Sequence, residues 1–417
     1  MNGSTHAHFA GARWVRVDLH LHSPGSHTFA FPQGMSTAQR DQVVEAYVQQ
    51  LNDQGIEICA ITDYQQIPED WYIGVREGAR EKGIYVYPGV ELSFAGGKAG
   101  KYGLHVLAIF PYEEDISRIN AVIRNLDDRP SEQLIDKIGK HRDLIPKDGV
   151  DKFLLRLRQE TNCILIFPHP NDDKGLLKTY KPKEAAEILA QVRPEAIEDF
   201  SQEEWNRLLN TAQIQKDFLA RIATVYSSDN HRIEEIGTKT LPSGAIRATY
   251  LKLSAPDQIQ ALRLALRDSE ILVRLAQKPE PAYTRIEALA VDGNGFLENL
   301  RLTFSPDLNV FIGGRGVGKS AVLEVIRYVL DLPVYGPTEY REGLVRHALG
   351  SGGKAILHLC QVVKSGVERR YRVERVWGEP PRVYELTAQG EHLVELPPQE
   401  LFAENDQPLF FGQRGNL

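Results

Sequence analysis

Short apolar runs alternate with amphipathic stretches along the first two thirds of the chain. The runs are rich in β-branched residues, as buried strands are, and they read WVRVDLHLH, IEICAITD, IYVYPGVEL, LHVLAIF, CILIFPH, ATVYSSD and ATYLKLS. Segments with the helical period lie between them, such as TAQRDQVVEAYVQQLNDQG and KEAAEILAQV. This rhythm predicts an α/β fold with a mostly parallel sheet and crossover helices. Seven such strands favour a closed or nearly closed barrel over an open sheet.

The pattern breaks at QKPEPAYTR, residues 277–285, where two prolines interrupt it. We therefore expect two domains, residues 1–280 and residues 281–417. The second domain is predicted to contain strands at RIEALAVDGNGFLENLRLTF and LNVFIGG, a helix at SAVLEVIRYVLD, and a strand-rich tail from about Lys354.

Composition changes this picture little. A chain of 417 residues, 42% hydrophobic and 25% charged, is long enough for two cores, which excludes a fibrous or disordered protein. Cys59, Cys163 and Cys360 each lie in an apolar run and suit reduced thiols. No signal-peptide pattern or membrane-length apolar run occurs, so we expect a cytoplasmic protein without a membrane partner. The net charge of -7 gives no support for a nucleic-acid partner, so that inference depends on local chemistry.

Histidine and carboxylate side chains recur where the predicted strands end. His20 and His22 are two positions apart and are expected to share one face of the first strand, with Leu19 and Leu21 on the other. The series continues along the chain with Asp63, Glu91, His105, His169, Asp229 and His231. A single polar residue at a strand end is usually only hydrogen-bonded. Repetition at successive strands, whose ends meet at one rim of a parallel barrel, predicts a metal centre.

The motifs DLHLHS, ITDY, GVELS, LHVLAIF, PHP and SSDNH, in this order, resemble the polymerase and histidinol phosphatase (PHP) superfamily over about residues 14–275. The resemblance implies a distorted seven-stranded (βα) barrel in which two or three divalent metals hydrolyse phosphoesters. It implies one metal bound by His20, His22, Glu91 and Asp229, a second by Glu91, His105 and His169, and a third served by His27 and His231. The catalytic group would be His20, His22, Glu91, His169 and Asp229, with Glu91 as the bridge. Mixed nitrogen and oxygen ligands suit Mn, Zn or Fe.

One position departs from the family pattern. The second motif of the family ends in a histidine that is implied to bind the third metal, and this chain has Tyr64 there. A phenol is a poor ligand near neutral pH because its pKa is about 10. His27 stands where family members often have aspartate and could compensate in part. Whether a third metal binds therefore stays open.

A phosphate-loop pattern lies in the second domain. GGRGVGKS fits G-x-x-x-x-G-K-[ST] and lies between a predicted strand and a predicted helix, the context that such a loop requires. The backbone of Gly313, Gly316 and Gly318 and the helix N-terminus would hold the phosphates of ATP. Lys319 would reach the β and γ phosphates, and Ser320 would hold Mg.

The residues around this loop resemble the N-terminal lobe of ABC ATPases of the SMC, RecF and Rad50 type. LFFGQRG resembles the glutamine loop of that lobe, with Gln413 sensing Mg and the γ-phosphate. The signature and Walker B motifs lie beyond this loop in the family and are absent here. We therefore expect a partial ABC-type lobe that binds ATP weakly and hydrolyses it poorly. Such lobes pair around ATP, so a homodimer is a further expectation.

The order of the two domains resembles the PHP-ATPase proteins of the TrlF type. It implies a metal-dependent nuclease acting on DNA or RNA, gated by ATP, in genome maintenance or phage defence. Two alternatives stay open. One is a small-molecule phosphomonoesterase of the histidinol-phosphatase type. The other is a non-catalytic, nucleotide-dependent DNA-binding assembly module, in which Tyr64 marks a lost metal.

Overall fold

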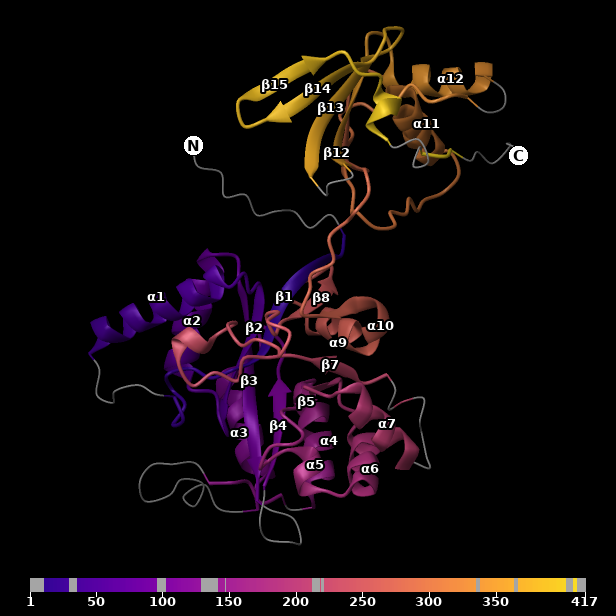
Figure 1. The fold of residues 1–417 in the computed structure, drawn as a ribbon. Helices are drawn as coiled ribbons and strands as arrows, with labels where there is room; N and C mark the ends of the chain where they lie inside the picture. Colours follow the sequence, from indigo (N-terminus) through magenta and orange to yellow (C-terminus); the bar gives the residue numbers. More distant parts are fainter. Residues whose placement is uncertain are drawn as a thin grey trace. The chain divides into compact units, whose positions relative to one another are not determined.

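A computed structural model describes residues 11–29, 36–95, 103–128, 142–146, 148–211, 218, 221–334, 338–363, 367–402 and 408–410. The chain divides into two compact units, Met1–Pro279 (unit 1) and Glu280–Leu417 (unit 2) (Figure 1). Within the described ranges, no helix is long and apolar enough to cross a membrane.

Unit 1 is a mixed α/β structure. Its strands are β1 (Arg13–Leu21), β2 (Ile58–Tyr64), β3 (Tyr85–Phe94), β4 (Leu104–Ile109), β5 (Ile164–Phe167), β6 (Ala196–Glu198), β7 (Ala223–Val225), β8 (Thr249–Leu253) and β9 (Val273–Leu275). Its helices are α1 (Thr37–Asp53), α2 (Glu69–Glu81), α3 (Ile116–Leu126), α4 (Val150–Thr161), α5 (Leu176–Thr179), α6 (Pro182–Val192), α7 (Gln202–Thr211), α9 (Ile259–Arg267) and α10 (Ser269–Leu272), with a 3-10 turn at Ile233–Glu235. Local signals set several boundaries, as at α1, where Ser36 and Gln39 form a capping box.

The nine strands form one sheet in the order β7-β6-β5-β4-β3-β2-β1-β8-β9. The chain after β7 returns to the other side of this sheet. The backbone of Tyr226 bonds to the Thr249 hydroxyl on β8, and the Asp229 N–H donates to the His20 carbonyl on β1 at 2.9 Å. These bonds bring the two sides of the sheet together, so the expected nearly closed, barrel-like sheet is confirmed.

Two apolar clusters lie on the two faces of this sheet. The inner cluster takes side chains from all nine strands, including Val15, Val17 and Leu19, and from helix α9. The outer cluster packs the opposite strand face against helices α1 to α7. In the view of Figure 1, α1 and α2 lie to the left of the strands and α6 and α7 to the right, and all four pack on the outer face. The sheet is thus buried on both faces, as expected for strands that read as nearly continuous apolar runs.

The strand prediction needs two corrections. The sheet has nine strands rather than seven, because β6 and β9 are only three residues long and show no periodicity. It is also less parallel than predicted, since β4 pairs antiparallel with β3 and β5, and β8 with β1 and β9.

Simple alternation also fails at the end of β1. The register with β2 shifts between Asp18 and Leu21, where β1 carries one extra residue. Leu19 therefore packs in the inner cluster and Leu21 in the outer one, so these two leucines do not share a face. Bulges of this kind re-aim side chains next to functional sites.

Unit 2 contains a six-stranded sheet in the order β11-β10-β12-β13-β14-β15, with antiparallel pairing throughout. Its elements are β10 (Arg285–Asp292), β11 (Arg301–Thr303), α11 (Lys319–Val329), α12 (Thr338–Leu349), β12 (Lys354–Val362), β13 (Glu368–Val376), β14 (Arg382–Thr387), β15 (Gly390–Val394) and a 3-10 turn at Pro398–Leu401. Apolar side chains of α11 and α12 pack on β10, β12 and β13 to form its core.

The predicted strand at LNVFIGG is wrong, since residues 304–318 contain no strand in the structure. Leu308, Val310 and Ile312 are 87%, 67% and 92% exposed, whereas Phe311 packs against the unit 2 core. The alternation is real, but a strand also needs a neighbour for its backbone hydrogen bonds. Among the described residues this segment has no strand partner.

Candidate metal centre

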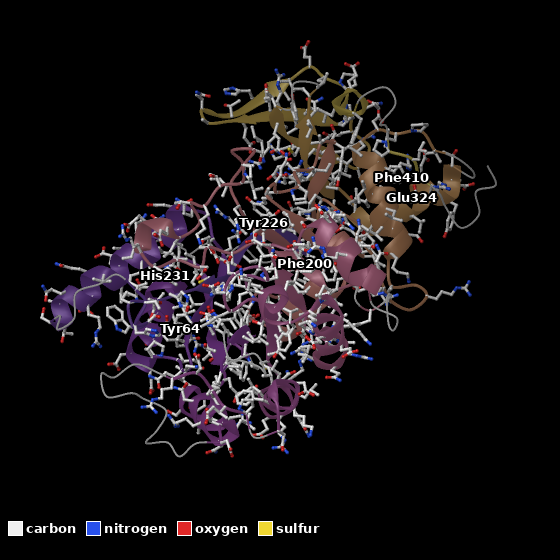
Figure 2. The ribbon with its side chains drawn as sticks, turned by 60° about the horizontal axis from the view of Figure 1, so that its bottom comes forward. Tyr64, Phe200, Tyr226, His231, Glu324 and Phe410 are labelled. Atoms are coloured by element: carbon white, nitrogen blue, oxygen red, sulfur yellow. The ribbon has the colours of Figure 1, made fainter. Side chains whose placement is uncertain are left out.

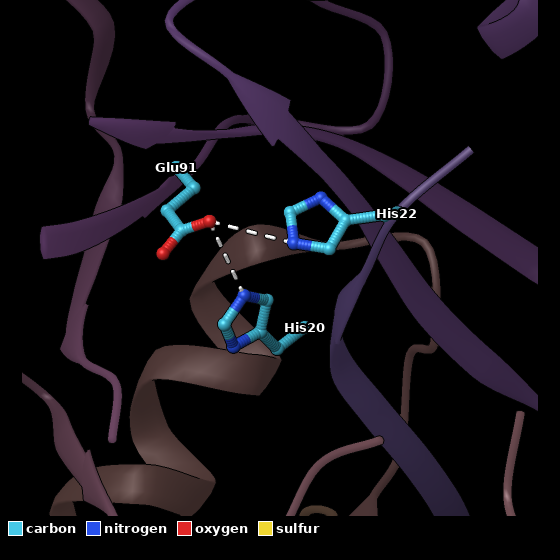
Figure 3. A group of neighbouring side chains, drawn as sticks. All are labelled: His20, His22 and Glu91. Atoms are coloured by element: carbon cyan, nitrogen blue, oxygen red, sulfur yellow. Dashed lines mark ion pairs between the residues drawn. The ribbon is translucent and has the colours of Figure 1, made fainter. Parts of the chain in front are cut away.

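Three buried side chains converge at the rim of the barrel: His20 on β1, His22 directly after β1, and Glu91 on β3 (Figure 3). The Nε2 atoms of His20 and His22 lie 3.7 and 3.4 Å from the same carboxylate oxygen, Oε2 of Glu91. The bulge in β1 directs both imidazoles to this point although Leu19 and Leu21 diverge.

The three converging atoms are all buried and make no hydrogen bond. Unpaired buried polar atoms are rare because each costs free energy. Atoms that share a tetrahedral cation at about 2.0–2.2 Å stand about 3.4 Å apart, close to the separations seen here. The cluster therefore fits a divalent cation better than it fits hydrogen bonding.

Asp229 adds a second carboxylate to this group. Its Oδ1 lies 3.5 Å from His20 Nε2 and 3.4 Å from His22 Nε2. Its backbone is left-handed, with φ of 43°. A non-glycine residue in this conformation is strained and is typical of functional sites.

A second group forms around the other oxygen of Glu91. Oε1 of Glu91 contacts His105 Nδ1 and lies 3.3 Å from His169 Nε2, and the two nitrogens are 3.4 Å apart. His105 is the second residue of β4, which runs antiparallel to β3, and His169 follows β5 with a left-handed φ of 32°. Glu91 thus stands between two groups of potential ligands, one on each oxygen.

A carboxylate lies behind each of the first two imidazoles, within hydrogen-bond distance of His20 but not of His22. His20 Nδ1 lies 3.2 Å from Glu198 Oε2, and His22 Nδ1 lies 3.6 Å from Asp63 Oδ1. Such partners fix the tautomer of a metal-binding histidine. Sequence reasoning missed Glu198. The signal was present in EAIEDF, a short apolar pair followed by acids at a strand end.

Asn230 joins the segment after β7 to β1. Its side chain accepts from the His22 N–H at 2.9 Å and donates to the His22 carbonyl at 3.1 Å. Asp18 accepts from the Ser228 N–H at 3.1 Å and from its hydroxyl. These bonds set the position of Asp229 relative to the two imidazoles.

The charges in the centre favour protonated imidazoles in the absence of a cation. Burial lowers the pKa of His22, but Asp229 and Asp63 outweigh it and raise that pKa to about 9. Burial likewise lowers the pKa of His20, while Glu198 and Asp229 raise it well above its usual value. Burial raises the pKa of Glu91, but His105 and His169 hold it well below its usual range. The carboxylates around His20 and His22 therefore stabilise positive charge there, whereas burial lowers the pKa of His105 in the second group.

Tyr64, His27 and His231 lie beside the centre, and among the described residues neither of these two histidines belongs to a group of three His, Cys, Asp or Glu ligand atoms. The Tyr64 ring lies 5.0 Å from His22, nearly parallel to it, and 5.0 Å from the exposed His27. The exposed His231 ring lies 5.5 Å from His22. Figure 2 labels Tyr64 and His231. Burial and the Glu91 and Asp229 carboxylates raise the pKa of the Tyr64 phenol, so its proton is retained.

Two basic residues of unit 1 lie at different distances from the centre. Arg13 begins β1 and pairs with Glu57, at the strand end opposite His20. The Lys174 ammonium donates to Ser93 Oγ at 2.9 Å, and the same oxygen lies 3.1 Å from His105 Nε2.

The phosphate-loop residues of unit 2 lie at the start of α11. Gly316 and Gly318 have φ of 86° and 94°, a conformation that favours glycine. The Lys319 ammonium donates to the Gly313 and Gly314 carbonyls at 2.7 and 2.6 Å. Ser320 is in the first turn of α11. Gln413 lies outside the described residues.

No protein-family model matches the chain, and no curated protein matches it in sequence. Three solved structures are similar in fold. A two-domain protein from Bacteroides vulgatus, containing a predicted PHP-like metal-dependent phosphoesterase, is 13% identical over 73% of this chain and 87% of its own, with a TM-score of 0.40. A protein from Bifidobacterium adolescentis, with a proposed metal-dependent phosphoesterase activity, is 13% identical over 60% of this chain and 95% of its own, with a TM-score of 0.35. An amidohydrolase from Chromobacterium violaceum with bound sulfate and no metal is 15% identical over 54% of this chain and 92% of its own, also with a TM-score of 0.35.

Proposed function

We propose that unit 1 is a metal-dependent phosphoesterase of the PHP type. One observation carries the proposal: the two oxygens of the buried Glu91 face two separate groups of histidines. In this proposal the first cation is held by His20, His22, Glu91 and Asp229, and the second by Glu91, His105 and His169. Bound cations of this kind supply Lewis acidity and lower the pKa of water.

The surrounding residues have supporting roles in this reaction. Glu198 and Asp63 keep the Nε2 atoms of His20 and His22 directed at the first cation position. Lys174 is about two-fifths exposed beside Ser93 and His105, so its ammonium is available to a phosphate oxygen of the substrate. Asp229, about a third exposed, lies on the solvent side of the centre.

We further propose that the substrate is DNA or RNA and that unit 2 regulates the reaction by binding ATP with Mg. Support for the nucleotide comes from the loop Gly313–Ser320, with its two left-handed glycines and Lys319 at the helix start. In this proposal Gly313, Gly316, Gly318, Lys319 and Ser320 bind the triphosphate and Gln413 senses it. Pairing of two copies through unit 2 is part of the same proposal.

Hydrolysis of a phosphodiester tests the function of unit 1. The protein is loaded with Mn and given bis(p-nitrophenyl) phosphate, single-stranded and duplex DNA, and RNA. Glu91→Gln removes the shared charge, and Glu81→Gln at the exposed end of α2 is the matched control. We expect cleavage by the unaltered protein and the control, and none by Glu91→Gln. Nucleic acids left intact, with His169→Ala indistinguishable from the unaltered protein, would end the nuclease proposal.

The same assay separates the alternatives. Turnover of p-nitrophenyl phosphate without any phosphodiester cleavage would favour a small-molecule phosphomonoesterase. Fewer than one bound metal per chain after loading would favour a non-catalytic assembly module.

Nucleotide binding is tested with a fluorescent ATP analogue and Mg. Lys319→Ala should weaken binding because it removes the ammonium from the loop, whereas Lys183→Ala on the exposed face of α6 should not. Equal affinity for both variants would contradict the role of the loop. A change in nucleic-acid cleavage on adding ATP would support regulation by unit 2, and no change would contradict it.

A further inference from the structure

Tyr64 lies at the junction of the two histidine groups. It is the last residue of β2, and the parallel register places it directly beside Glu91 on β3. Its ring lies 5.0 Å from His22, inclined by 14°, and meets the edge of His105 at 5.4 Å. Tyr64 therefore contacts one imidazole from each group and adjoins the carboxylate that the groups share.

The packing of the Tyr64 ring fixes its hydroxyl in an anionic environment. Glu91 is the register partner of Tyr64, and the Asp229 carboxylate lies 3.4 Å from Nε2 of His22, on which the Tyr64 ring stacks. A phenol has one hydrogen to donate and, while it keeps that proton, is a poor cation ligand. A phosphate ester bound at the cation positions would bring further anionic oxygens to the same place. A donor that is already fixed there stabilises the charge that develops during reaction.

The neighbours of Tyr64 do not complete another cation site. His27 and His231 are both exposed, and among the described residues neither joins two other ligand atoms in a group. The third metal that the sequence resemblance implies thus lacks a ligand set here.

We propose that Tyr64 is a catalytic residue that donates a hydrogen bond to a phosphoryl oxygen of the substrate, in a centre that holds two cations and no third. The inference rests on the phosphoesterase function proposed above for the same site. It adds a substrate-binding donor to a centre otherwise made of cation ligands.

The test compares Tyr64→Phe with Tyr85→Phe, each of which loses only a hydroxyl. Tyr85 begins β3, at the strand end opposite Glu91. Metal content after Mn loading and removal of excess metal, melting temperature, kcat and KM for bis(p-nitrophenyl) phosphate are measured for each protein. We expect two metals per chain and an unchanged melting temperature in all three. We expect kcat to fall about a hundredfold in Tyr64→Phe alone.

A kcat within twofold of the unaltered protein for Tyr64→Phe would overturn the donor role. Three metals per chain in the unaltered protein would overturn the two-cation centre. If the unaltered protein binds two metals but hydrolyses no phosphoester, the phosphoesterase proposal fails and takes the donor role with it, while the two-cation centre stands. A smaller kcat caused by metal loss would show in the metal content, and that result would also count against the donor role.

Discussion

A carboxylate lies on the side of each of the His20 and His22 rings that faces away from Glu91, and the one at His20 is within hydrogen-bond distance. Glu198 contacts His20 Nδ1 and Asp63 lies near His22 Nδ1, which leaves both Nε2 atoms directed at the shared oxygen. A carboxylate in this position fixes the tautomer and makes the opposite nitrogen more basic. The two acids should therefore contribute to cation affinity without touching the cation.

Replacing Glu198 tests this arrangement. Glu198→Gln keeps the volume of the side chain but removes its charge, and should weaken Mn binding about 10- to 100-fold. Glu187→Gln on the exposed face of α6 is the control and should bind as the unaltered protein does. Competition with a fluorescent chelator measures both affinities. Equal affinities would show that Glu198 does not act through His20.

Cation binding should depend on pH because protons and the cation compete for the same nitrogens. Since the pKa of His22 is about 9 without a cation, its ring is protonated at neutral pH and must lose that proton on binding. Affinity should therefore fall as pH falls below 9, by about tenfold per pH unit for each proton released. Calorimetric titration with Mn at pH 6, 7 and 8 in buffers of different ionisation enthalpy measures affinity and proton release together. An affinity that does not change with pH would contradict protonated imidazoles.

At the scale of elements, the strand ends show which parts of the site the sequence pattern predicts and which it does not. Histidines and acids after successive apolar runs indicated that His20, His22 and Glu91 converge, because strands in one sheet bring their ends together. Alternation alone could not reveal the bulge in β1, since register depends on the pairing with β2. Glu198 was not predicted as a site residue because β6, which it ends, is three residues long and too short to show a period.

Close packing between strands also positions the Glu91 carboxylate. Gly89 lies two residues before Glu91 on β3, where a Cβ would come within 2.7 Å of the Thr62 side chain on β2. Only glycine allows β2 and β3 to approach this closely. The requirement for glycine at this position of YPGVELS could not be predicted from the sequence pattern.

In unit 2, a buried ion-pair network joins α11 to α12. Glu324 on α11 accepts from Arg327 at 2.7 Å and from Arg341 on α12, and all three side chains are buried (Figure 2 labels Glu324). Glu324→Ala leaves two guanidinium groups unpaired and should destabilise this pair of helices by about 3–5 kcal/mol. Glu339→Ala in the exposed first turn of α12 should have little effect. Hydrogen exchange of α11 amides measures the difference, and equal protection in the two variants would contradict the network's role.

At the scale of the whole molecule, the chain combines two units with separate cores. The metal-centre residues come from unit 1 and the phosphate-loop residues from unit 2. The segment Leu308–Ile312 shows that alternation alone does not predict strand pairing. Its alternation predicts a strand, but the pattern does not specify a neighbour, and its apolar side chains are exposed. A half-buried strand requires both the alternation and a paired edge.

The central claim is that Glu91 bridges two cations in unit 1. Anomalous diffraction from crystals soaked in Mn tests it most directly, because it counts the cations and locates them. We expect two peaks, one bordered by His20, His22 and Glu91 and the other by Glu91, His105 and His169. No peak at the centre, or a single peak that does not contact Glu91, would contradict it.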